Sequence, residues 1–212
     1  MFTVMVIDDS PFIVDIFVTM LQRGGYQTVA AYGGQEALEL LETVRPDLIL
    51  LDIMMEPMDG WETLMNIKNN PRTRDIPVMM LTAKQLTPNE AQEYGIYIED
   101  YIMKPITHRE LYEAIEGQLN RRKVMELDVQ LAREAGVDEA TIQEYKRLRK
   151  SIDINKRLLK LLESTYRVTE EKGKEEDDMV MAIRSMAMNL HFQEEQMEKL
   201  RNSFSAMSKT AK

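Results

Sequence analysis

The stretch that decides the fold is PDLILLDIMMEPMDG, which runs from Pro46 to Gly60. Residues 48–51 within it are an unbroken apolar run, and that run ends at one acid, Asp52. A continuous apolar run indicates a strand that is covered on both faces. Pro57 and the Asp59-Gly60 pair then supply residue types that are typical of turns. The stretch therefore predicts a buried strand that ends in a carboxylate and turns into the next element.

Strand-like and helix-like segments alternate on both sides of this stretch. The apolar runs predict strands at residues 3–9, 27–32, 46–52, 76–83 and 98–105. Periodicity and capping residues predict helices at residues 10–26, 33–45, 58–70, 87–95 and 107–122. Such alternation indicates an α/β fold with a doubly wound parallel sheet, in which helices cover both faces. Ligands of these sheets bind at the carboxyl ends of the strands.

Chemically active residues stand at those strand ends. The first predicted strand ends in Asp8 and Asp9, the third in Asp52, the fourth in Thr82 and the fifth in Lys104. Three carboxylates at one edge would repel one another and need a cation, and hard oxygen ligands suit Mg²⁺. A lysine and a threonine hydroxyl can hold a phosphoryl group, and an aspartate can accept one covalently. The pattern predicts an aspartate that becomes phosphorylated, with metal and lysine neutralising the charge.

Each member of this set has an ordinary explanation when taken alone. An acid after a strand is usually a helix cap or a turn residue, and a lysine is usually solvated. Asp8, Asp9 or Thr82 alone would therefore indicate little. All the positions together, on the correct successive strands, are hard to obtain by chance, so we prefer the functional interpretation.

The motifs that carry these residues are VIDDS, LLDIMMEPMDG, MLTA and DYIMKP. With them, residues 2–122 resemble the receiver domain of two-component response regulators, the CheY-like family. The resemblance implies a flavodoxin-like sheet of five parallel strands in the order 2-1-3-4-5. It also implies that Asp52 accepts a phosphoryl group from a histidine kinase. The domain would then be a signalling switch and not an enzyme, apart from self-phosphorylation and slow self-dephosphorylation.

The resemblance implies roles for the residues around Asp52. The ligands of Mg²⁺ would be Asp8, Asp9, Asp52 and the backbone carbonyl of Met54. Thr82 would bond the phosphoryl group, and Lys104 would contact it. Tyr101 would be the switch aromatic that moves inward with Thr82. The peptide bond between Lys104 and Pro105 would be cis.

Three further positions bear on this chemistry through the same resemblance. Met54 and Lys84 each lie two residues after a site residue, at positions that flank the phosphoryl group in the family. A bulky apolar Met54 is expected to shield the phosphoryl group and to slow self-dephosphorylation. The family usually has proline four residues after the acceptor, where this chain has Glu56 and places Pro57 next. This departure concerns the geometry of the loop and its surface charge.

Residues 123–212 contain no proline and predict an all-α module behind the receiver domain at 1–122. Its expected elements are a short helix at about 124–135 and long helices at about 138–168 and 178–208. A charged turn around Gly173 would join the long helices. Two such helices should fold back on each other as an antiparallel hairpin or coiled coil, which would dimerise or bind a partner.

Apolar residues at 3-4 spacing form a seam on each long helix. The first seam is Tyr145, Leu148, Ile152, Asn155, Leu159, Leu162 and Tyr166. The second is Met179, Ile183, Met186, Leu190, Gln193, Met197, Leu200, Phe204 and Met207. Asn155 and Gln193 interrupt the seams, and we interpret them as polar residues that set the register.

Composition excludes several function classes. The net charge of -9 falls on residues 1–122, where 10 Lys and Arg face 19 Asp and Glu, while the rest holds 17 of each. Neither part has the basic excess of a nucleic-acid binder. There is no cysteine, and His108 and His191 lie far apart, so a thiol or zinc site is not expected. No signal peptide or membrane-spanning run is visible, which favours a cytoplasmic protein.

Two other functions remain as alternatives to the signalling switch. A DNA-binding regulator could use the basic run at 146–157, although nearby acids cancel its charge. A phosphotransfer or phosphatase component could use similar aspartate chemistry, or His191 on the second long helix. The expected partners are a cognate histidine kinase and an unidentified downstream protein, with a second copy of the chain, bound through the hairpin, as a further option. No membrane is expected, and nucleic acid is disfavoured.

Overall fold

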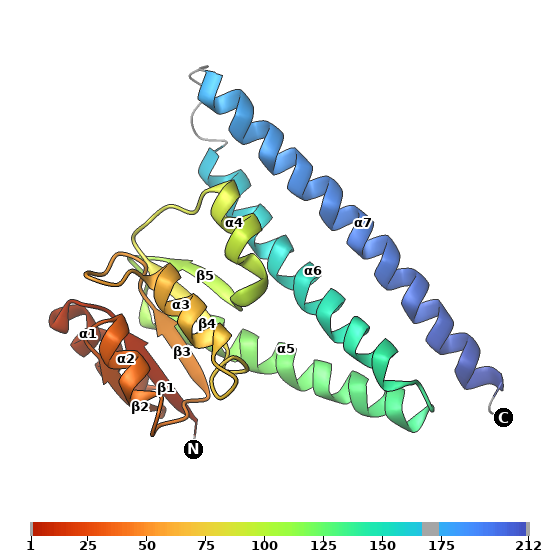
Figure 1. Cartoon of the computed structure of the whole chain (residues 1–212), viewed down its shortest axis with the longest axis horizontal. Coiled ribbons are helices and arrows are strands. Elements are labelled where there is room, and N and C mark those ends of the chain that lie inside the picture. Colours follow the sequence, from red (N-terminus) through yellow and green to blue (C-terminus); the bar gives the residue numbers. More distant parts are fainter. Residues whose placement is uncertain (1, 167–173, 211–212) are drawn as a thin grey trace. The chain divides into compact units, whose positions relative to one another are not determined.

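The computed structural model describes residues 2–166 and 174–210, and it contains the predicted α/β sheet followed by helices. The five strands are β1 (Thr3–Ile7), β2 (Gln27–Ala31), β3 (Leu48–Leu51), β4 (Val78–Thr82) and β5 (Asp100–Met103). They pair in parallel in the order β2-β1-β3-β4-β5, which confirms the predicted topology (Figure 1). Every residue of β3 and β4 is buried, as the unbroken apolar runs predict.

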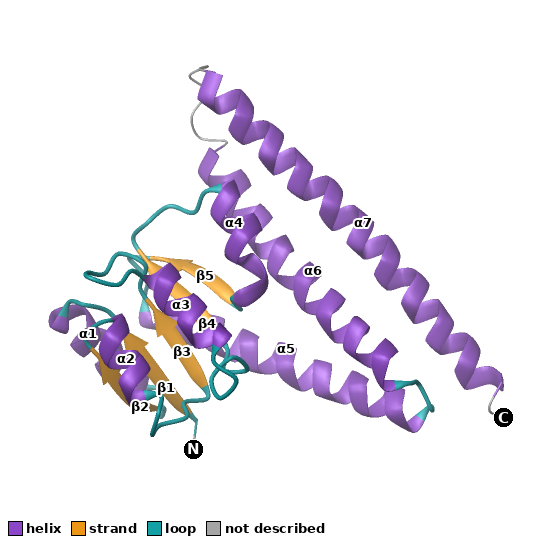
Figure 2. Cartoon of the chain, in the orientation of Figure 1, coloured by secondary structure: helices purple, strands orange, loops and turns teal. Residues whose placement is uncertain are grey.

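Short helices connect the strands (Figure 2). They are α1 (Pro11–Arg23), α2 (Gly34–Leu40), α3 (Gly60–Asn69) and α4 (Pro88–Tyr94), with a 3-10 turn at Gly95–Tyr97. From β1 the chain crosses to β2 at one edge of the sheet, and from β2 it crosses back past β1 to β3. Because both crossovers are right-handed and run in opposite directions, α1 lies on one face of the sheet and the α2–α3 pair on the other. The packing agrees with this, because the Tyr112 hydroxyl, from the last receiver helix, donates to the Met20 carbonyl of α1.

Helix ends follow the predicted capping residues with one exception. Thr87 caps α4 in a reciprocal capping box with Glu90, and Gly25 ends α1 in the left-handed region at φ 83°. Ser10 stands at the N-cap position of α1, but its side chain makes no cap hydrogen bond. Its backbone N–H instead donates to Asp8 Oδ1 at 2.9 Å. The expected cap is thus replaced by a contact with a site residue.

The second half of the chain forms three long helices: α5 (His108–Glu134), α6 (Glu139–Tyr166) and α7 (Lys174–Thr210). The closing receiver helix and the short helix expected at 124–135 are one continuous helix, because no residue between them breaks α5. The turn expected around Gly173 lies outside the described residues. None of the helices in the two described ranges is long and apolar enough to cross a membrane.

The chain packs as two compact units rather than dividing only at the predicted position after residue 122. One unit combines Met1–Gln85 with Tyr97–Ile115, and the other combines Leu86–Ile96 with Glu116–Lys212. Helix α4, which follows β4 in sequence, therefore packs with the helices of the second unit. Helix α5 begins in the first unit and ends in the second.

Helices α6 and α7 lie side by side as an antiparallel hairpin (Figure 1). The side chains of Asn155 and Gln193 meet across the pair, with Asn155 Nδ2 3.2 Å from Gln193 Oε1. Ser151 joins them, since Gln193 Nε2 donates to its hydroxyl at 3.0 Å. The two polar residues that interrupt the seams are thus paired with each other, as a register-setting role requires.

Helix α6 buries a second face that the seam pattern does not include. Ile154 and Leu158, which lie outside the predicted seam, are each 1% exposed. A Cβ added to Gly95, at the end of α4, would lie 3.0 Å from Leu158 Cδ1. The expectation of one seam on α6 is corrected here, because α4 covers a second side of the helix.

Candidate functional site

Strand register brings the predicted site residues to one edge of the sheet. Ile7 of β1 pairs with Leu51 of β3, so the residues that follow them, Asp8 and Asp52, are neighbours. The ladder continues into the site, because the Asp52 N–H donates to the Ile7 carbonyl at 2.9 Å. On the other side, the Lys104 N–H donates to the Thr82 carbonyl at 2.8 Å. Backbone pairing alone therefore places these side chains.

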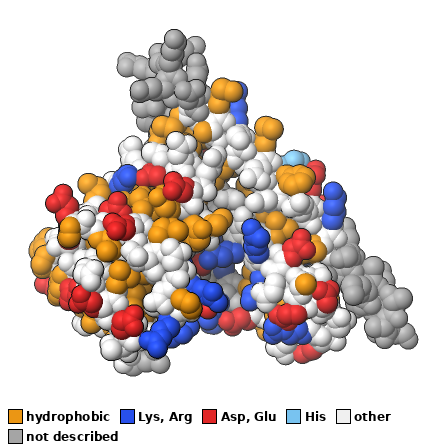
Figure 3. Space-filling model, in the orientation of Figure 1, with side chains coloured by type: hydrophobic (Ala, Val, Ile, Leu, Met, Phe, Trp, Pro, Cys, Tyr) orange, Lys and Arg blue, Asp and Glu red, His pale blue; other side chains and the backbone are white. Residues whose placement is uncertain are grey.

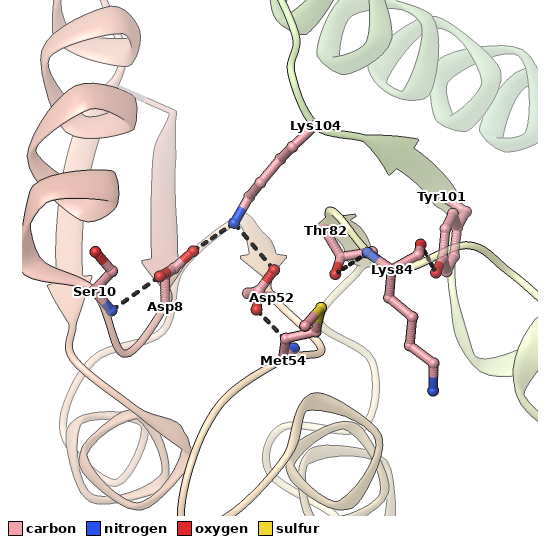
Figure 4. A network of polar contacts seen from close by, with 8 residues as sticks. All are labelled: Asp8, Ser10, Asp52, Met54, Thr82, Lys84, Tyr101 and Lys104. Atoms are coloured by element: carbon pink, nitrogen blue, oxygen red, sulfur yellow. Dashed lines mark hydrogen bonds and ion pairs between the residues drawn. The ribbon is translucent and has the colours of Figure 1, made fainter.

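The Lys104 ammonium lies between two buried carboxylates (Figure 4). Its Nζ is 2.5 Å from Asp8 Oδ2 and 3.0 Å from Asp52 Oδ1. Asp8 is 5% exposed and Asp52 is 6% exposed, so water screens these ion pairs weakly. The Phe17 ring lies 5.9 Å from the same nitrogen. The single positive charge of Lys104 thus attracts two acids that would otherwise repel each other, and it offsets part of their negative charge.

The second oxygen of Asp52 is held by the loop that follows β3. The Met54 N–H donates to Asp52 Oδ2 at 2.7 Å, which fixes the orientation of the carboxylate. Gly60 allows this loop to close, because a Cβ there would lie 2.1 Å from the Asp52 carbonyl oxygen. Asp59 then starts α3 by accepting from the Glu62 N–H at 2.8 Å. The Asp-Gly pair of the opening stretch therefore serves both the cap and the close approach.

The shifted Glu56-Pro57 pair contacts the site directly. The Glu56 N–H donates to Asp9 Oδ2 at 3.1 Å. The Glu56–Pro57 peptide bond is cis, and so is the Lys104–Pro105 bond, as the family resemblance implies. Because residue 56 is not proline, it retains the backbone N–H that makes this bond. Sequence reasoning noticed the departure but not its consequence, which is an extra donor to Asp9.

Thr82 and Tyr101 meet at the backbone of Lys84. Thr82 is fully buried, and its Oγ1 accepts from the Lys84 N–H at 3.2 Å. The Tyr101 hydroxyl donates to the Lys84 carbonyl at 2.7 Å, and the Tyr101 ring is 6% exposed (Figure 4). The Trp61 ring stacks on it at 6.4 Å between centroids. Tyr101 is therefore held at both its ring and its hydroxyl, and Trp61 is a neighbour that the strand-end argument did not identify.

The donor set at this edge suits a hard divalent cation. Asp8, Asp9 and Asp52 supply carboxylate oxygens, and the Met54 carbonyl is a further oxygen ligand of the type that Mg²⁺ accepts. In the part of the chain that the structure describes, no three acids or histidines are gathered with metal-binding geometry. In this arrangement Lys104 contacts Asp8 and Asp52, and the Glu56 amide contacts Asp9. The ligand types fit the metal, which Asp8, Asp9, Asp52 and the Met54 carbonyl would hold.

The residues considered for other chemistry lie elsewhere. His191 is on α7, with its Nε2 3.4 Å from Glu195 Oε1 and three quarters of its side chain exposed. His108 begins α5, and its ring packs edge-on against Tyr112 at 6.1 Å. Within the basic run of α6, Arg149 pairs with Asp128 at 2.7 Å and Lys156 with Glu194 at 2.6 Å. No histidine joins the aspartate site, and the basic run has acidic partners.

Comparisons with known families agree with the geometry of the sheet edge. The family model described as "Response regulator receiver domain" matches residues 4–116, which is more than half of the chain. A second family model, described as "Metanogen output domain 2", matches residues 121–208. The two matches meet within α5, the helix that runs from one unit into the other.

One curated relative matches a comparable length of the chain. The phosphate regulon transcriptional regulatory protein PhoB of Pseudomonas aeruginosa is 35% identical over 119 residues, which cover 56% of this chain and 52% of that protein. The chain thus spans about half the length of this curated relative.

Two solved structures are also similar. The N-terminal domain of a response regulator receiver protein from Methanoculleus marisnigri JR1 is 68% identical and covers 55% of this chain and 95% of its own, with a TM-score of 0.48. The Vibrio cholerae chemotaxis protein CheY4 is 28% identical and covers 55% of this chain and 97% of its own, with a TM-score of 0.52. With the strand order, the aspartate and lysine edge and the family match in agreement, the chain belongs to the response regulator receiver family of two-component signalling.

Proposed function

We propose that the chain is a phosphorylation-controlled switch, in which Asp52 accepts a phosphoryl group from a histidine kinase and the helical unit carries the output. The observation that supports this most directly is the environment of the Asp52 carboxylate. It is buried at the end of β3, one oxygen contacts the Lys104 ammonium, and the other is held by the Met54 amide. An oriented carboxylate beside a fixed positive charge is suited to nucleophilic attack on phosphorus.

The transfer step can be written from these residues. An oxygen of Asp52 attacks the phosphorus of a phosphohistidine, an O–P bond forms, and the N–P bond breaks with its electron pair returning to the imidazole nitrogen. Lys104 stabilises the negative charge on the phosphoryl oxygens, and the Thr82 hydroxyl lies one strand away to bond one of them. Mg²⁺, when bound by Asp8, Asp9, Asp52 and the Met54 carbonyl, would supply further neutralisation of charge. The lack of cysteine is consistent with action in the reducing cytoplasm.

Phosphorylation can reach the helical unit through the segment that connects β4 to α4. Tyr101 and Thr82 both bond Lys84, at its carbonyl and its N–H respectively. Two residues later, the Leu86 carbonyl accepts from the Tyr166 hydroxyl of α6 at 3.3 Å. The segment is therefore hydrogen-bonded both at residue 84 and at residue 86. A rearrangement of Thr82 and Tyr101 would move it and weaken or strengthen the hydrogen bond from Tyr166. We propose this segment as the coupling element between the phosphorylation site and the hairpin.

The hairpin is proposed to act on a protein rather than on DNA. The seam between α6 and α7 is already filled within the chain, with Met186 and Leu190 buried in it. Exposed Met181 and Met188 offer a flexible apolar surface on α7 that suits a protein partner. The name of the PhoB relative concerns transcription, but the matched length corresponds to the receiver part of this chain. DNA retention that falls steeply with added salt would favour the DNA-binding alternative instead.

Phosphorylation of Asp52 is the test of the proposed function. Wild type and Asp52→Ala are incubated with a small phosphodonor and Mg²⁺, and the intact mass is recorded. Wild type should gain one phosphoryl group and Asp52→Ala none. Asp8 also contacts Lys104, but its other oxygen accepts from the Ser10 N–H, whereas that of Asp52 is oriented by the loop after β3.

Asp15→Asn is the matched control, since Asp15 is an exposed aspartate on α1. This variant should be phosphorylated as the wild type is. Equal phosphorylation of the wild type and Asp52→Ala would refute the assignment, and omission of Mg²⁺ with no loss of rate would refute the proposed metal requirement.

A further inference from the structure

The second half of α5 exposes an apolar stripe that no part of the described chain covers. Val124 is 44% exposed, Leu127 is 60% exposed and Leu131 is 63% exposed. Their spacing of three and then four residues places them on one side of the helix. Hydrophobic side chains reach the surface in several places on the face drawn in Figure 3, but isolated ones need no explanation. A row with coiled-coil spacing is different, because it presents a continuous seam.

This stripe lies on a side of α5 that is separate from the one packed inside its own unit. Val129 is 7% exposed and forms a small core with Val137 and Ile142. With 100° between successive residues, Val129 is turned about 160° away from Leu127 around the helix. The chain therefore uses one face of α5 for its own fold and leaves Leu127 and Leu131 exposed on the opposite one, while Val124 borders a hollow that Tyr145 and Arg149 of α6 also line.

The stripe fits the heptad pattern of a parallel two-helix coiled coil. Val124 takes an a position and Leu127 the following d position, and a β-branched residue at a with leucine at d favours two strands. Leu131 is the next a residue. In a parallel pair each of these residues would meet its own copy, and so would Gly117 and Asn120, which take the a and d positions of the preceding heptad. An antiparallel pair would instead set the apolar Leu131 against the polar Asn120.

The residues that flank the stripe decide the partner. In a parallel coiled coil, each g residue faces the e residue five positions later on the other helix. The two g–e pairs of this stripe are Glu116 with Arg121 and Lys123 with Asp128, and both join opposite charges. Asp128 also accepts from Arg149 and Tyr145 within its own chain, and a third of its side chain stays exposed. Arg121 likewise donates to Gln118 at 3.1 Å, so the contacts across the dimer would be added to contacts within each chain. The charges of the stripe are therefore complementary to the same stripe on an identical chain.

A second exposed apolar row on α7 lacks this complementarity. Met181, Met188 and Phe192 also follow coiled-coil spacing. Their flanking g–e pairs are Arg184 with Asn189 and His191 with Gln196, which contain no pair of opposite charges. Self-pairing is therefore supported at α5 and not at α7.

We propose that a second copy of this chain binds along the 116–131 stretch of α5, as a parallel, in-register coiled coil with two-fold symmetry. The interface goes beyond the proposed phosphorylation switch and does not depend on it. It is a different surface from the hairpin, whose α6–α7 seam is filled from within the chain.

A single engineered cysteine tests both the pairing and its direction, because the chain has no cysteine of its own. Under mild oxidation, Leu127→Cys should form a covalent dimer in high yield, since a d residue meets itself in a parallel pair. Glu126→Cys, one residue away on the outer side of the helix, is the matched control and should remain monomeric under the same conditions. Absence of a Leu127→Cys dimer, or equal yields for the two variants, would overturn the proposal.

Orientation and surface are tested separately. If Val124→Cys and Leu127→Cys cross-link only with each other, the pairing is antiparallel and the proposal fails. Sedimentation of cysteine-free protein, without any cross-link, should show a dimer for the wild type and for Met188→Glu, and a monomer for Leu127→Glu. A Leu127→Glu variant that stays dimeric would place the interface elsewhere, and a wild type that is monomeric at every concentration would remove it.

Charge reversal tests the flanking pairs. Glu116→Arg replaces the two symmetry-related attractions to Arg121 by repulsions. It should lower the association constant of the dimer roughly fivefold to tenfold. Adding Arg121→Glu restores opposite charges and should recover the wild-type constant. If the double variant is no better than Glu116→Arg, the g–e pairing is wrong.

Discussion

At the scale of single residues, the site depends on which donor each carboxylate oxygen of Asp8, Asp9 and Asp52 accepts from. Lys104 bridges the two buried acids, while backbone amides from Ser10, Met54 and Glu56 take oxygens of the three. These donors hold the carboxylates apart in orientations that a metal or a phosphoryl group can use after partner exchange. The side chain of Met54, by contrast, is exposed, so it can be substituted without disturbing the packing of the fold.

Substitution of Met54 should change the lifetime of the phosphorylated protein. The Met54 side chain is 62% exposed, and its own backbone N–H orients Asp52. We expect this apolar side chain to keep water from the phosphoryl group. Met54→Asn should shorten the half-life several-fold because an amide can position an attacking water. The decay of phosphoprotein mass after removal of the phosphodonor measures this, and Met54→Leu, which keeps the bulk, should decay as the wild type does. An unchanged half-life in Met54→Asn would disprove the shielding role.

At the scale of elements, a polar cluster connects α6 to α7. Ser151, Asn155 and Gln193 bond one another across the hairpin, inside seams that are otherwise apolar. A polar group in such a seam lowers stability but disfavours other registers, because a shift would leave it unpaired. Helix α6 adds a second packed face, with Ile154 and Leu158 buried where α4 lies.

The cluster should be strongly coupled when it is mutated. Gln193→Ala removes the partner of both Asn155 and Ser151 and should lower the free energy of unfolding by about 1–2 kcal/mol. Asn155→Leu in the same chain should return much of that loss, because the orphaned amide is gone and the seam is apolar. Urea denaturation of the two single variants and the double variant measures the coupling. Gln196→Ala, at an exposed position on the same helix, is the control, and additive effects at 155 and 193 would contradict the pairing.

At the scale of the whole molecule, α4 is the element whose place in sequence and place in the packing differ. It follows β4 in sequence but packs within the helical unit, and Tyr166 bonds the carbonyl of Leu86 just before it. Burial, together with the negative charge of Glu90, raises the pKa of the Tyr166 hydroxyl above its ordinary value. The neutral hydroxyl is thus the form that the packed unit favours.

Loss of the Tyr166 hydroxyl should uncouple the hairpin from phosphorylation. Because its pKa is raised on folding, the stability it contributes is complete below the unfolded pKa, near 10, and is lost as pH rises through the folded pKa. The protection factors of the amides at 86–96, in which the measured exchange rate is corrected for the intrinsic base-catalysed rate at each pH, should therefore fall in strongly alkaline solution in the wild type. In Tyr166→Phe they should be low already at neutral pH and should no longer respond to a phosphodonor. Tyr97→Phe serves as the control, and an unchanged phosphodonor response in Tyr166→Phe would rule out this route.

The sequence by itself determined the sheet, the identity of the strand-end residues and the presence of the hairpin. Apolar runs such as LILL at 48–51 have few alternatives to a buried parallel strand, and parallel strands carry their carboxyl ends to one edge. Local patterns of this kind are readable because each residue's neighbours along the chain set the period. The positions of Asp8, Asp52, Thr82 and Lys104 follow from that register alone.

Only the tertiary structure decided which partner each polar or apolar group meets. The contact of the Glu56 amide with Asp9 joins residues 47 positions apart, and that of Tyr166 with Leu86 joins residues 80 apart. Likewise, α4 follows the sheet pattern in sequence but buries Leu158 of α6, and α5 continues without a break where a boundary was expected. Such contacts depend on how finished elements pack, because burial and hydrogen bonding reward proximity in space whatever the separation along the chain.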